Sequence, residues 1–345
     1  MKLKSSAIAL AVAGALGASM AAQADSGFYG SIRVGVVYTD GPAGEAGTDR
    51  RTYYDKDGNL VTDAATEASS TTEKSTNIQS VSSRFGFRGE TDMGNGLTGF
   101  GRFEWAVSNT GAVSGRHMYA GLKGDWGSVL AGQTYHTFYN YVLAGLDNPW
   151  RGTGFTTTWT GYRGRLPSAA TYNGEFGAVN IGATIYMDDS TEGSDGSPND
   201  LDAYELGISG QAGPVTLAFA YSDVDETDSD AAYGIVAKNW NIGIFTLGAG
   251  YFAQGNGAAP GTASSIIFDM YIGNAYVHLE TKDKDSGGTV GEKPMLATLG
   301  YTQSVGRQTT AYYEIYNLDT DGKLNSDMTS ADELSVAAVL KYDWK

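Results

Sequence analysis

Hydrophobic and polar residues alternate with a period of two along most of the chain, in segments of about ten residues that are separated by polar or glycine-rich connections. The last segment shows the pattern most clearly. Its apolar face holds Leu334, Val336, Ala338, Leu340, Tyr342 and Trp344. Alternation of this kind predicts β-strands with one apolar face. In a soluble sandwich that face would point to a core and in a membrane barrel to lipid, so alternation alone leaves both folds open.

The connections between these segments favour the barrel. Short turns are predicted at residues 94–96, 124–127, 174–177, 212–214, 239–241, 273–274 and 305–307. Longer polar connections are predicted near residues 40–79, 108–115, 135–166, 188–201, 224–229, 255–263, 282–292 and 320–331. Strict alternation of short turns and long loops is typical of outer-membrane barrels, whose short turns are periplasmic and whose long loops are external. Seven turns and eight loops join sixteen strands, so the sequence predicts an all-β fold, a transmembrane antiparallel β-barrel of sixteen strands.

The first residues have the features of an export signal. Lys2 and Lys4 make the start positive, residues 7–17 are apolar, and Ala22-Gln23-Ala24 forms a small-x-small cleavage site before Asp25. We therefore expect residues 1–24 to be a cleaved signal peptide and residues 25–345 to form a single barrel domain. Elsewhere every apolar run is shorter than the roughly 20 residues of a membrane-spanning helix.

Composition and charge agree with a β-rich exported protein. The chain of 345 residues contains 48 Gly, 22 Tyr and no Cys, so it would have to close through backbone hydrogen bonds and not through disulfides. Without Lys2 and Lys4, the 23 basic residues become 21 against 39 acidic ones, and the expected mature chain carries a net charge of −18. This charge disfavours a nucleic-acid partner. The acidic residues concentrate near residues 40–74, 188–202 and 223–230, where we expect solvated loops.

Two long motifs carry a resemblance to a known family. Residues 83–104 read SRFGFRGETDMGNGLTGFGRFE and residues 116–133 read RHMYAGLKGDWGSVLAGQ. Both resemble the general Gram-negative outer-membrane porins. The resemblance implies a trimer of sixteen-stranded barrels in the outer membrane, with the third loop folded into the pore. It also implies, as partners, outer-membrane lipids and lipopolysaccharide, the barrel-assembly machinery and small hydrophilic solutes.

The chain departs from the family pattern at two positions. Gln133 stands where many members have an arginine, and Lys345 follows Trp344 where many members end on an aromatic residue. We expect the apolar residues Leu340, Tyr342 and Trp344 to serve as the C-terminal assembly signal.

Inward-pointing basic residues are the candidate wall of the pore constriction. Arg33 alternates with Ile32 and Val34, and Arg84, Arg88 and Arg102 alternate in the same way with apolar neighbours, whereas the phase of Arg116 is ambiguous. A charged side chain in such a strand stays hydrated only when it points into the lumen. The candidate wall residues are Arg33, Arg84, Arg88, Arg102, Arg116 and Gln133. Two interpretations remain open, namely a basic selectivity wall or arginines that merely pair with Glu90 and Glu104.

The connection at residues 135–166 is the candidate constriction loop. It is longer than most loops of compact proteins, and such loops are usually functional or disordered. Its candidate residues are Asp147, Trp150, Arg151, Arg163 and Arg165. Its aromatic content argues against disorder, and an ordinary external loop is the alternative.

No chemistry of an enzyme emerges from the sequence. His117, His136 and His278 lie in separate segments without metal-ligand spacing, and no nucleophile and base are paired. We expect no metal and no cofactor. The leading hypothesis is a water-filled diffusion pore with weak anion preference, because wall charges act at contact distance while the acidic loops are screened. The alternatives are a substrate-specific channel for an anion or a sugar and, with less support, a barrel hydrolase.

Overall fold

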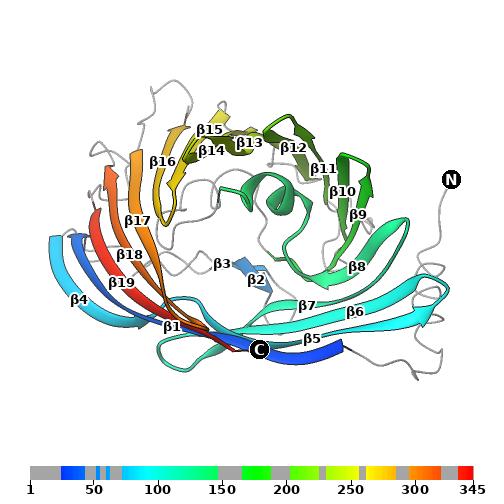
Figure 1. Ribbon diagram of the computed structural model, residues 1–345, viewed down its shortest axis with the longest axis horizontal. Coiled ribbons are helices and arrows are strands. Elements are labelled where there is room, and N and C mark those ends of the chain that lie inside the picture. The colour runs from blue at the N-terminus through cyan, green and yellow to red at the C-terminus, as the bar shows by residue number, and fades with distance from the viewer. Residues whose placement is uncertain are drawn as a thin grey trace.

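The computed structural model describes residues 25–42, 52–54, 60–62, 72–146, 165–187, 203–224, 231–255, 262–284, 295–319 and 333–344, and almost all of them form one antiparallel sheet that closes on itself (Figure 1). The strands on the N-terminal side are β1 (Asp25–Pro42), β4 (Thr72–Ser80), β5 (Ser83–Gly94), β6 (Leu97–Val107), β7 (Val113–Gly124), β8 (Gly127–Gln133), β9 (Ala169–Phe176) and β10 (Val179–Tyr186). They are followed by β11 (Ala203–Ala212), β12 (Val215–Val224), β13 (Ala232–Ile242), β14 (Phe245–Gly255), β15 (Thr262–Ile272), β16 (Ala275–Lys284), β17 (Met295–Gly306), β18 (Thr309–Asp319) and β19 (Glu333–Trp344). A separate short hairpin joins β2 (Thr52–Tyr54) to β3 (Leu60–Thr62).

The barrel has sixteen wall strands, because two of the seventeen segments in the sheet form one interrupted strand. β5 pairs with the first half of β1 and β4 with the second half, both in the antiparallel sense. The interruption lies at Val81 and Ser82, where Ser82 has a φ of 63° and the Ser83 hydroxyl bonds both to the backbone N–H and to the carbonyl of Arg33. β1 also pairs with β19 and thereby closes the ring. The predicted sixteen-stranded antiparallel barrel is confirmed.

Two-residue turns join the strands at one end of the barrel, as predicted. The predicted connection at 40–79 was wrong at its C-terminal part, because residues 72–80 form the wall strand β4. Three of the seven predicted turn positions were wrong in detail. The turn after β17 lies at Arg307 and Gln308, beyond the centre of the predicted range 305–307. The turn after β9 lies at residues 177–178, beyond the predicted Gly174–Gly177 centre. The turn after β13 lies at Gly243 and Ile244, because a bulge between Ala237 and Trp240 shifts the register and Trp240 and Asn241 still pair with Leu247 and Thr246 of β14.

The outer face of the wall is apolar. Ile32, Val34 and Val36 of β1 are about half exposed, although each is an aliphatic side chain in the middle of a strand. The same holds for Leu340 and Tyr342 of β19. In water such a surface would be costly, and in a barrel it is the face that contacts lipid.

A short helix lies inside the ring (Figure 1). The segment of residues 134–146, here called the infolded segment, runs inward from the end of β8 and contains the π-helix η1 (Tyr139–Leu143). Its apolar side chains pack on lumen-facing apolar residues of the far wall, several of which are alanines. That cluster contains Phe138, Tyr141, Val142, Leu143 and Leu146 with Ala218, Ala220, Ala232, Val236, Phe252 and Ile267.

Glycines in the wall make room for this packing. A Cβ atom on Gly182 would lie 2.4 Å from the Tyr141 ring, and one on Gly207 would lie 2.7 Å from both Thr137 Cγ2 and the Tyr141 ring. Since real Cβ atoms do not approach that closely, these positions allow the infolded segment to contact β10 and β11 directly.

Buried hydrogen bonds hold the same segment in place. The backbone N–H of Phe138 donates to Glu205 Oε2 at 2.7 Å, and the backbone N–H of Thr137 donates to Thr184 Oγ1 at 3.2 Å. His136 completes the set, with Nδ1 2.9 Å from Thr171 Oγ1 and Nε2 3.1 Å from the carbonyl of Leu166.

In the part of the chain that the structure describes, no helix is both long and apolar enough to cross a bilayer.

Candidate functional site

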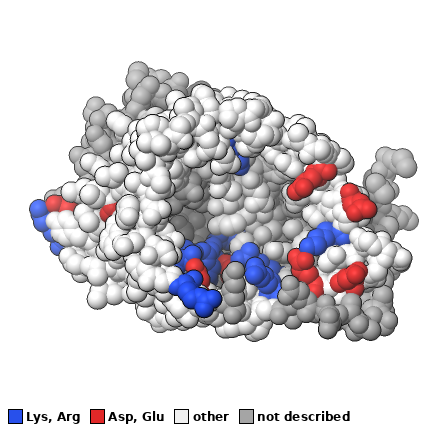
Figure 2. Space-filling view, viewed as in Figure 1, with Lys and Arg blue, Asp and Glu red and all other residues white. Residues whose placement is uncertain are grey.

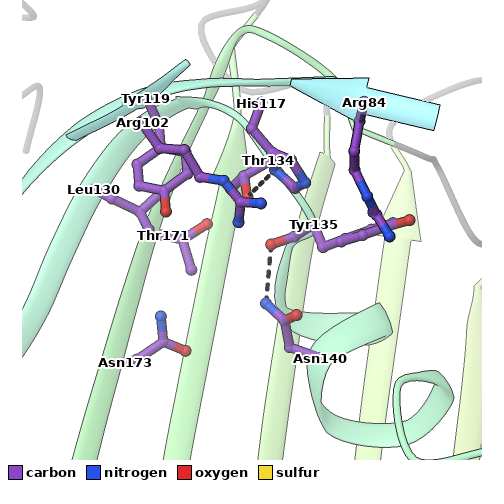
Figure 3. Close-up of a pocket in the computed structure, with 10 residues that line it drawn as sticks. All are labelled: Arg84, Arg102, His117, Tyr119, Leu130, Thr134, Tyr135, Asn140, Thr171 and Asn173. Atoms are coloured by element: carbon purple, nitrogen blue, oxygen red, sulfur yellow. Dashed lines mark hydrogen bonds between the residues drawn. The ribbon is translucent and has the colours of Figure 1, made fainter. Parts of the chain in front are cut away.

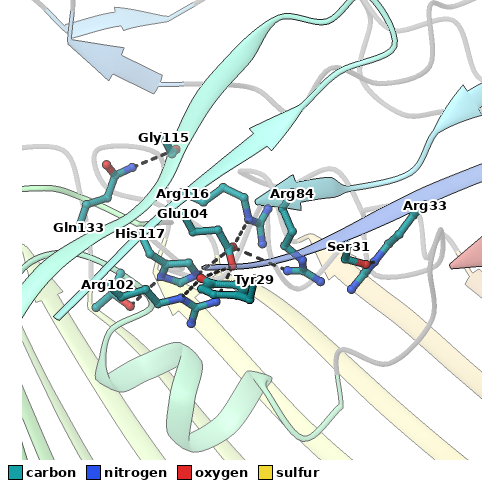
Figure 4. A network of polar contacts seen from close by, with 11 residues as sticks. Tyr29, Ser31, Arg33, Arg84, Arg102, Glu104, Gly115, Arg116, His117 and Gln133 are labelled. Atoms are coloured by element: carbon teal, nitrogen blue, oxygen red, sulfur yellow. Dashed lines mark hydrogen bonds and ion pairs between the residues drawn. The ribbon is translucent and has the colours of Figure 1, made fainter. Parts of the chain in front are cut away.

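Three arginines surround one buried carboxylate on the inner face of β5, β6 and β7 (Figure 4). Arg102 Nη2 lies 2.5 Å from Glu104 Oε2, Arg116 Nε lies 2.9 Å from Glu104 Oε1, and Arg84 Nη1 lies 3.9 Å from the same oxygen. The Tyr29 hydroxyl of β1 donates to Glu104 Oε2 at 2.9 Å and accepts a bond from Arg102 Nε at 2.5 Å. We call Arg84, Arg102 and Arg116 around Glu104 the arginine cluster.

The cluster presents positive charge to the lumen. The side chains of Arg84, Arg102 and Arg116 are 24%, 30% and 12% exposed, while that of Glu104 is 0% exposed. Three guanidinium groups against one carboxylate leave a net charge of +2. Figure 2 shows the basic side chains gathered along the side of the opening where Figure 1 draws β1, β5, β6 and β7. A solute in the lumen therefore meets guanidinium groups and not the carboxylate.

The remaining candidate arginines of the wall lie beside this cluster. Arg33 Nε donates to Ser31 Oγ at 3.0 Å on β1, next to Arg84 (Figure 4). The Arg88 guanidinium carbon lies 5.5 Å from the centre of the Tyr29 ring. Both arginines share the inner face with the cluster and extend it along the wall.

A bulge in β7 explains how Arg116 reaches the same face. Glu104 pairs with His117 and Trp105 pairs with Gly115, so Arg116 is an extra residue opposite a regular β6. In a regular strand Arg116 and His117 would point to opposite faces. The bulge lets both approach Glu104, with His117 Nε2 3.7 Å from Oε1.

Gln133 does not belong to this wall, and that prediction was wrong. Gln133 pairs directly with Met118, whose side chain is 47% exposed on the outer face. Directly paired residues of neighbouring strands point to the same side of a sheet. The Gln133 amide accordingly donates to the carbonyl of Gly115, 3.4 Å away and apart from the arginines (Figure 4).

Most of the candidate constriction loop lies outside the described residues, namely Asp147, Trp150, Arg151 and Arg163. Arg165 is described, and its guanidinium carbon lies 4.6 Å from the centre of the Tyr135 ring. Tyr135 in turn stacks on Tyr139 at 3.8 Å between ring centres. Arg165 thus lies against the infolded segment.

Sequence reasoning missed the central position of Glu104 and its bond to Tyr29. It also missed a group of buried acidic residues on the opposite wall. Asp269 and Glu280 are each 1% exposed and contact His278, which lies between them with Nδ1 2.5 Å from Asp269 Oδ1 and Nε2 3.5 Å from Glu280 Oε2. The inward phase of β15 and β16 could have placed these acids in the lumen, but nothing in a single sequence shows that they are covered.

The three histidines occupy separate hydrogen-bonded environments. His117 Nδ1 lies 2.9 Å from Thr134 Oγ1, His136 bonds to Thr171 and His278 bonds to Asp269. Among the described residues there is no group of three or more His, Cys, Asp or Glu side chains arranged to hold a metal ion.

Comparison with known proteins decides the family. The sequence matches the Gram-negative porin family over residues 7–323. The chain is a Gram-negative porin. It is 26% identical to the outer membrane porin PhoE of Enterobacter cloacae over 76% of this chain and 84% of that protein. It is 33% identical to the major outer membrane protein P.IB of Neisseria meningitidis serogroup B over 43% of this chain and 38% of that one.

Solved structures of porins share the fold. The anion-selective porin from Comamonas acidovorans superposes with a TM-score of 0.67 over 93% of this chain and 100% of that one, at 15% identity. OmpF of Salmonella typhi superposes with a TM-score of 0.64, also at 15% identity. At this identity the likeness shows the fold alone. Family membership places this porin in the outer membrane as a diffusion channel, and confirms the prediction that it is not an enzyme.

Proposed function

We propose that this porin conducts small hydrophilic solutes through a water-filled pore with weak preference for anions, set by the arginine cluster. The observation that carries the proposal is the difference in exposure between the partners. Arg84 and Arg102 are 24% and 30% exposed, while Glu104 is 0% exposed. The accessible charge on this side of the lumen is positive.

The distance to a passing ion favours this positive wall over the acidic residues near 40–74, 188–202 and 223–230, which the sequence predicts to lie in external loops. Charges at the pore mouth are screened over a Debye length of about 8 Å at physiological salt. Charges on a narrow wall act on a passing ion at contact distance with little water between. Asp269 and Glu280 of the opposite wall are buried and contact His278, so a passing ion does not meet them at contact distance.

Conductance in different salts tests this preference. Purified protein in planar bilayers is recorded in KCl, in LiCl and in potassium acetate at equal concentration. Lithium and acetate are the less mobile ions, so each replacement slows one sign of carrier. We expect acetate to lower the single-channel conductance more than lithium does. A larger effect of lithium would mean that cations carry most of the current.

The infolded segment is the second part of the proposal, as the element that narrows the lumen. Its helix packs on Ala218, Ala220 and Val236 across the ring from the arginine cluster, so it occupies part of the cross-section. Deletion of the stretch from Leu143 to Thr158, which takes away Leu143 and Leu146 from the packing of the infolded segment, is expected to raise single-channel conductance, because a sixteen-stranded barrel has a wide lumen once its inner element no longer packs on the wall. Unchanged conductance would show that this stretch does not constrict the pore.

The assembly of the protein belongs to the same proposal. Aromatic rings cover neighbouring strands of the outer face, with Phe28 5.0 Å from Phe87 and 6.1 Å from Trp344. Phe85 stacks on Trp105 at 5.4 Å. This aromatic surface on β1, β5, β6 and β19 supports a homotrimer in contact with lipid and lipopolysaccharide. Native mass spectrometry in detergent should give three copies, and a monomer under all mild conditions would contradict it.

The two ends of the chain support export and insertion. Lys2 and Lys4, the apolar residues 7–17 and the small-x-small sequence Ala22-Gln23-Ala24 before Asp25 support a signal peptide over residues 1–24. The apolar phase of β19 runs through Leu340 and Tyr342 on the outer face and ends at Trp344, a surface that the barrel-assembly machinery would read. Mass determination of the purified protein, expected to start at Asp25, checks the first statement.

A further inference from the structure

A recess of about 360 Å³ lies between the infolded segment and the wall beside the arginine cluster (Figure 3). Arg84 and Arg102 border it together with the rings of Tyr119 and Tyr135, and the amides of Asn140 and Asn173 lie on the opposite side. Small-molecule sites have volumes of roughly 300–1,000 Å³. The recess is therefore large enough for one small solute, and all of its named residues belong to described segments.

On the side of the recess formed by Arg84 and Arg102, guanidinium N–H groups can donate hydrogen bonds to a ligand. Arg84 lies 3.9 Å from Glu104, which is too long for a hydrogen bond. Within the described segments Arg102 uses Nε for Tyr29 and Nη2 for Glu104, which leaves its Nη1 group for a ligand. Planar guanidinium groups match the two oxygens of a carboxylate. With a net charge of +2 on the cluster, this side favours an anionic group.

The opposite side suits hydroxyl groups. Asn140 Nδ2 donates to the carbonyl of Tyr135 at 2.9 Å, which fixes the side chain and leaves its Oδ1 as an acceptor. Asn173 on β9 adds a second amide, which carries both donors and an acceptor. The ring of Tyr119 supplies apolar surface for a carbon skeleton.

From this combination we infer that the recess binds sugar acids, that is, polyhydroxylated carboxylates of monosaccharide size. The carboxylate contacts Arg84 and Arg102, and the hydroxyl groups contact Asn140 and Asn173. The inference rests on the proposed pore, because a solute reaches the recess only through the lumen. It adds a binding step for one class of solute to an otherwise non-specific anion preference.

Block of the ion current tests the inference with three probes. Glucuronate carries both the carboxylate and the hydroxyl groups, glucose carries only hydroxyl groups, and acetate carries only the carboxylate. Each is added to channels of the full mature protein in planar bilayers in KCl. We expect glucuronate to reduce the current at concentrations at least about tenfold lower than glucose or acetate, since it alone makes both sets of contacts. Equal potency of the three probes, or no block by glucuronate, overturns the inference.

Substitution of the two asparagines of the recess distinguishes a loss of ligand binding from a loss of positive charge in the lumen. Asn140→Ala and Asn173→Ala remove no charge, so a loss of block in them is not a loss of electric field. Each is expected to weaken glucuronate block by about tenfold, the effect of one lost hydrogen bond. The matched control is Asn180→Ala on β10, whose amide donates to Ser209 Oγ at 3.4 Å away from the recess, and it should keep the wild-type block.

The outcomes distinguish this inference from the proposed function. Channels that conduct and prefer chloride but show no selective block by glucuronate would overturn the recess as a binding site and leave the pore intact. Absence of conductance, or cation preference, would overturn the proposed function itself. Weakening of the block by Asn180→Ala to the same degree as by Asn173→Ala would also overturn the inference.

Discussion

Replacement of both Arg84 and Arg102 by alanine is expected to reverse the ionic preference of the pore. These two side chains are the most exposed members of the arginine cluster. In the double variant Arg116 remains bonded to Glu104 at 2.9 Å, and the pair is neutral overall. The net charge of the cluster falls from +2 to zero while the carboxylate keeps one partner.

The size of the effect follows from Coulomb's law. For an ion about 7 Å from the removed charges, two unit charges in water contribute about 1.2 kcal/mol before screening. A Debye length of about 8 Å reduces this to about 0.5 kcal/mol. Anions lose this stabilisation and cations escape the same repulsion, so the permeability ratio of chloride to potassium should fall roughly fivefold. A weakly anion-preferring pore then becomes weakly cation-preferring.

The assay is the reversal potential in planar bilayers across a KCl gradient, for wild type, the double variant and a matched control. The control is Lys74→Ala with Arg307→Ala, which removes two positive charges at an exposed strand end and in a short turn, away from the lumen. The double variant should move the potential toward that of potassium, and the control should move it little. A reversal potential that is unmoved in the double variant would refute the role of these arginines.

Three further predictions concern the elements around the cluster. Glu104→Gln leaves three guanidinium groups without a carboxylate. It is expected to increase anion preference in the reversal-potential measurement and to lower the thermal unfolding midpoint. A shift of the reversal potential toward that of potassium would contradict the role of Glu104 as the carboxylate that offsets part of the positive charge. Gly207→Val places new atoms against Thr137 and Tyr141, and should destabilise the fold by about 1–3 kcal/mol and make single-channel current noisier, whereas Gly27→Ala, which has open space, should do neither. Burial lowers the pKa of His136 to about 4 in the folded protein. Between pH 6.5 and 4 the imidazole is therefore protonated in the unfolded chain but mostly neutral in the folded chain. The free energy of unfolding should accordingly fall by roughly 3 kcal/mol from pH 6.5 to 4. Unfolding of wild type and His136→Gln between pH 7 and 4 isolates this contribution, and equal pH dependence of the two would contradict it.

The sequence predicts the barrel well because the physics of a membrane wall repeats in every strand. Each strand needs apolar residues on one face, so the alternation around Arg33, Arg84 and Arg102 indicates both the strand and its inner face. The turn after β13 shows the limit of this reasoning. A bulge consumes one residue, so the polar stretch around Trp240 lies in a strand although its composition favours a turn.

The site is less predictable because it depends on local irregularities and on long-range contacts. The bulge at Arg116 cannot be recognised from alternation, and the phase of Gln133 depends on its partner Met118. The position of Glu104 at the centre of the cluster requires Tyr29, which is 75 residues distant in the chain. The glycines that admit the infolded segment have no distinguishing signal among the 48 glycines of the sequence.

The most direct test of the central claim is the reversal potential of the wild-type porin across a tenfold gradient of KCl in a planar bilayer. We expect an open channel whose reversal potential lies modestly on the chloride side of zero, because the exposed charges of the arginine cluster are guanidinium groups. A potential close to that of an ideally potassium-selective pore would contradict the proposed anion preference, since Glu104 is fully buried while Arg84 and Arg102 are exposed to the lumen.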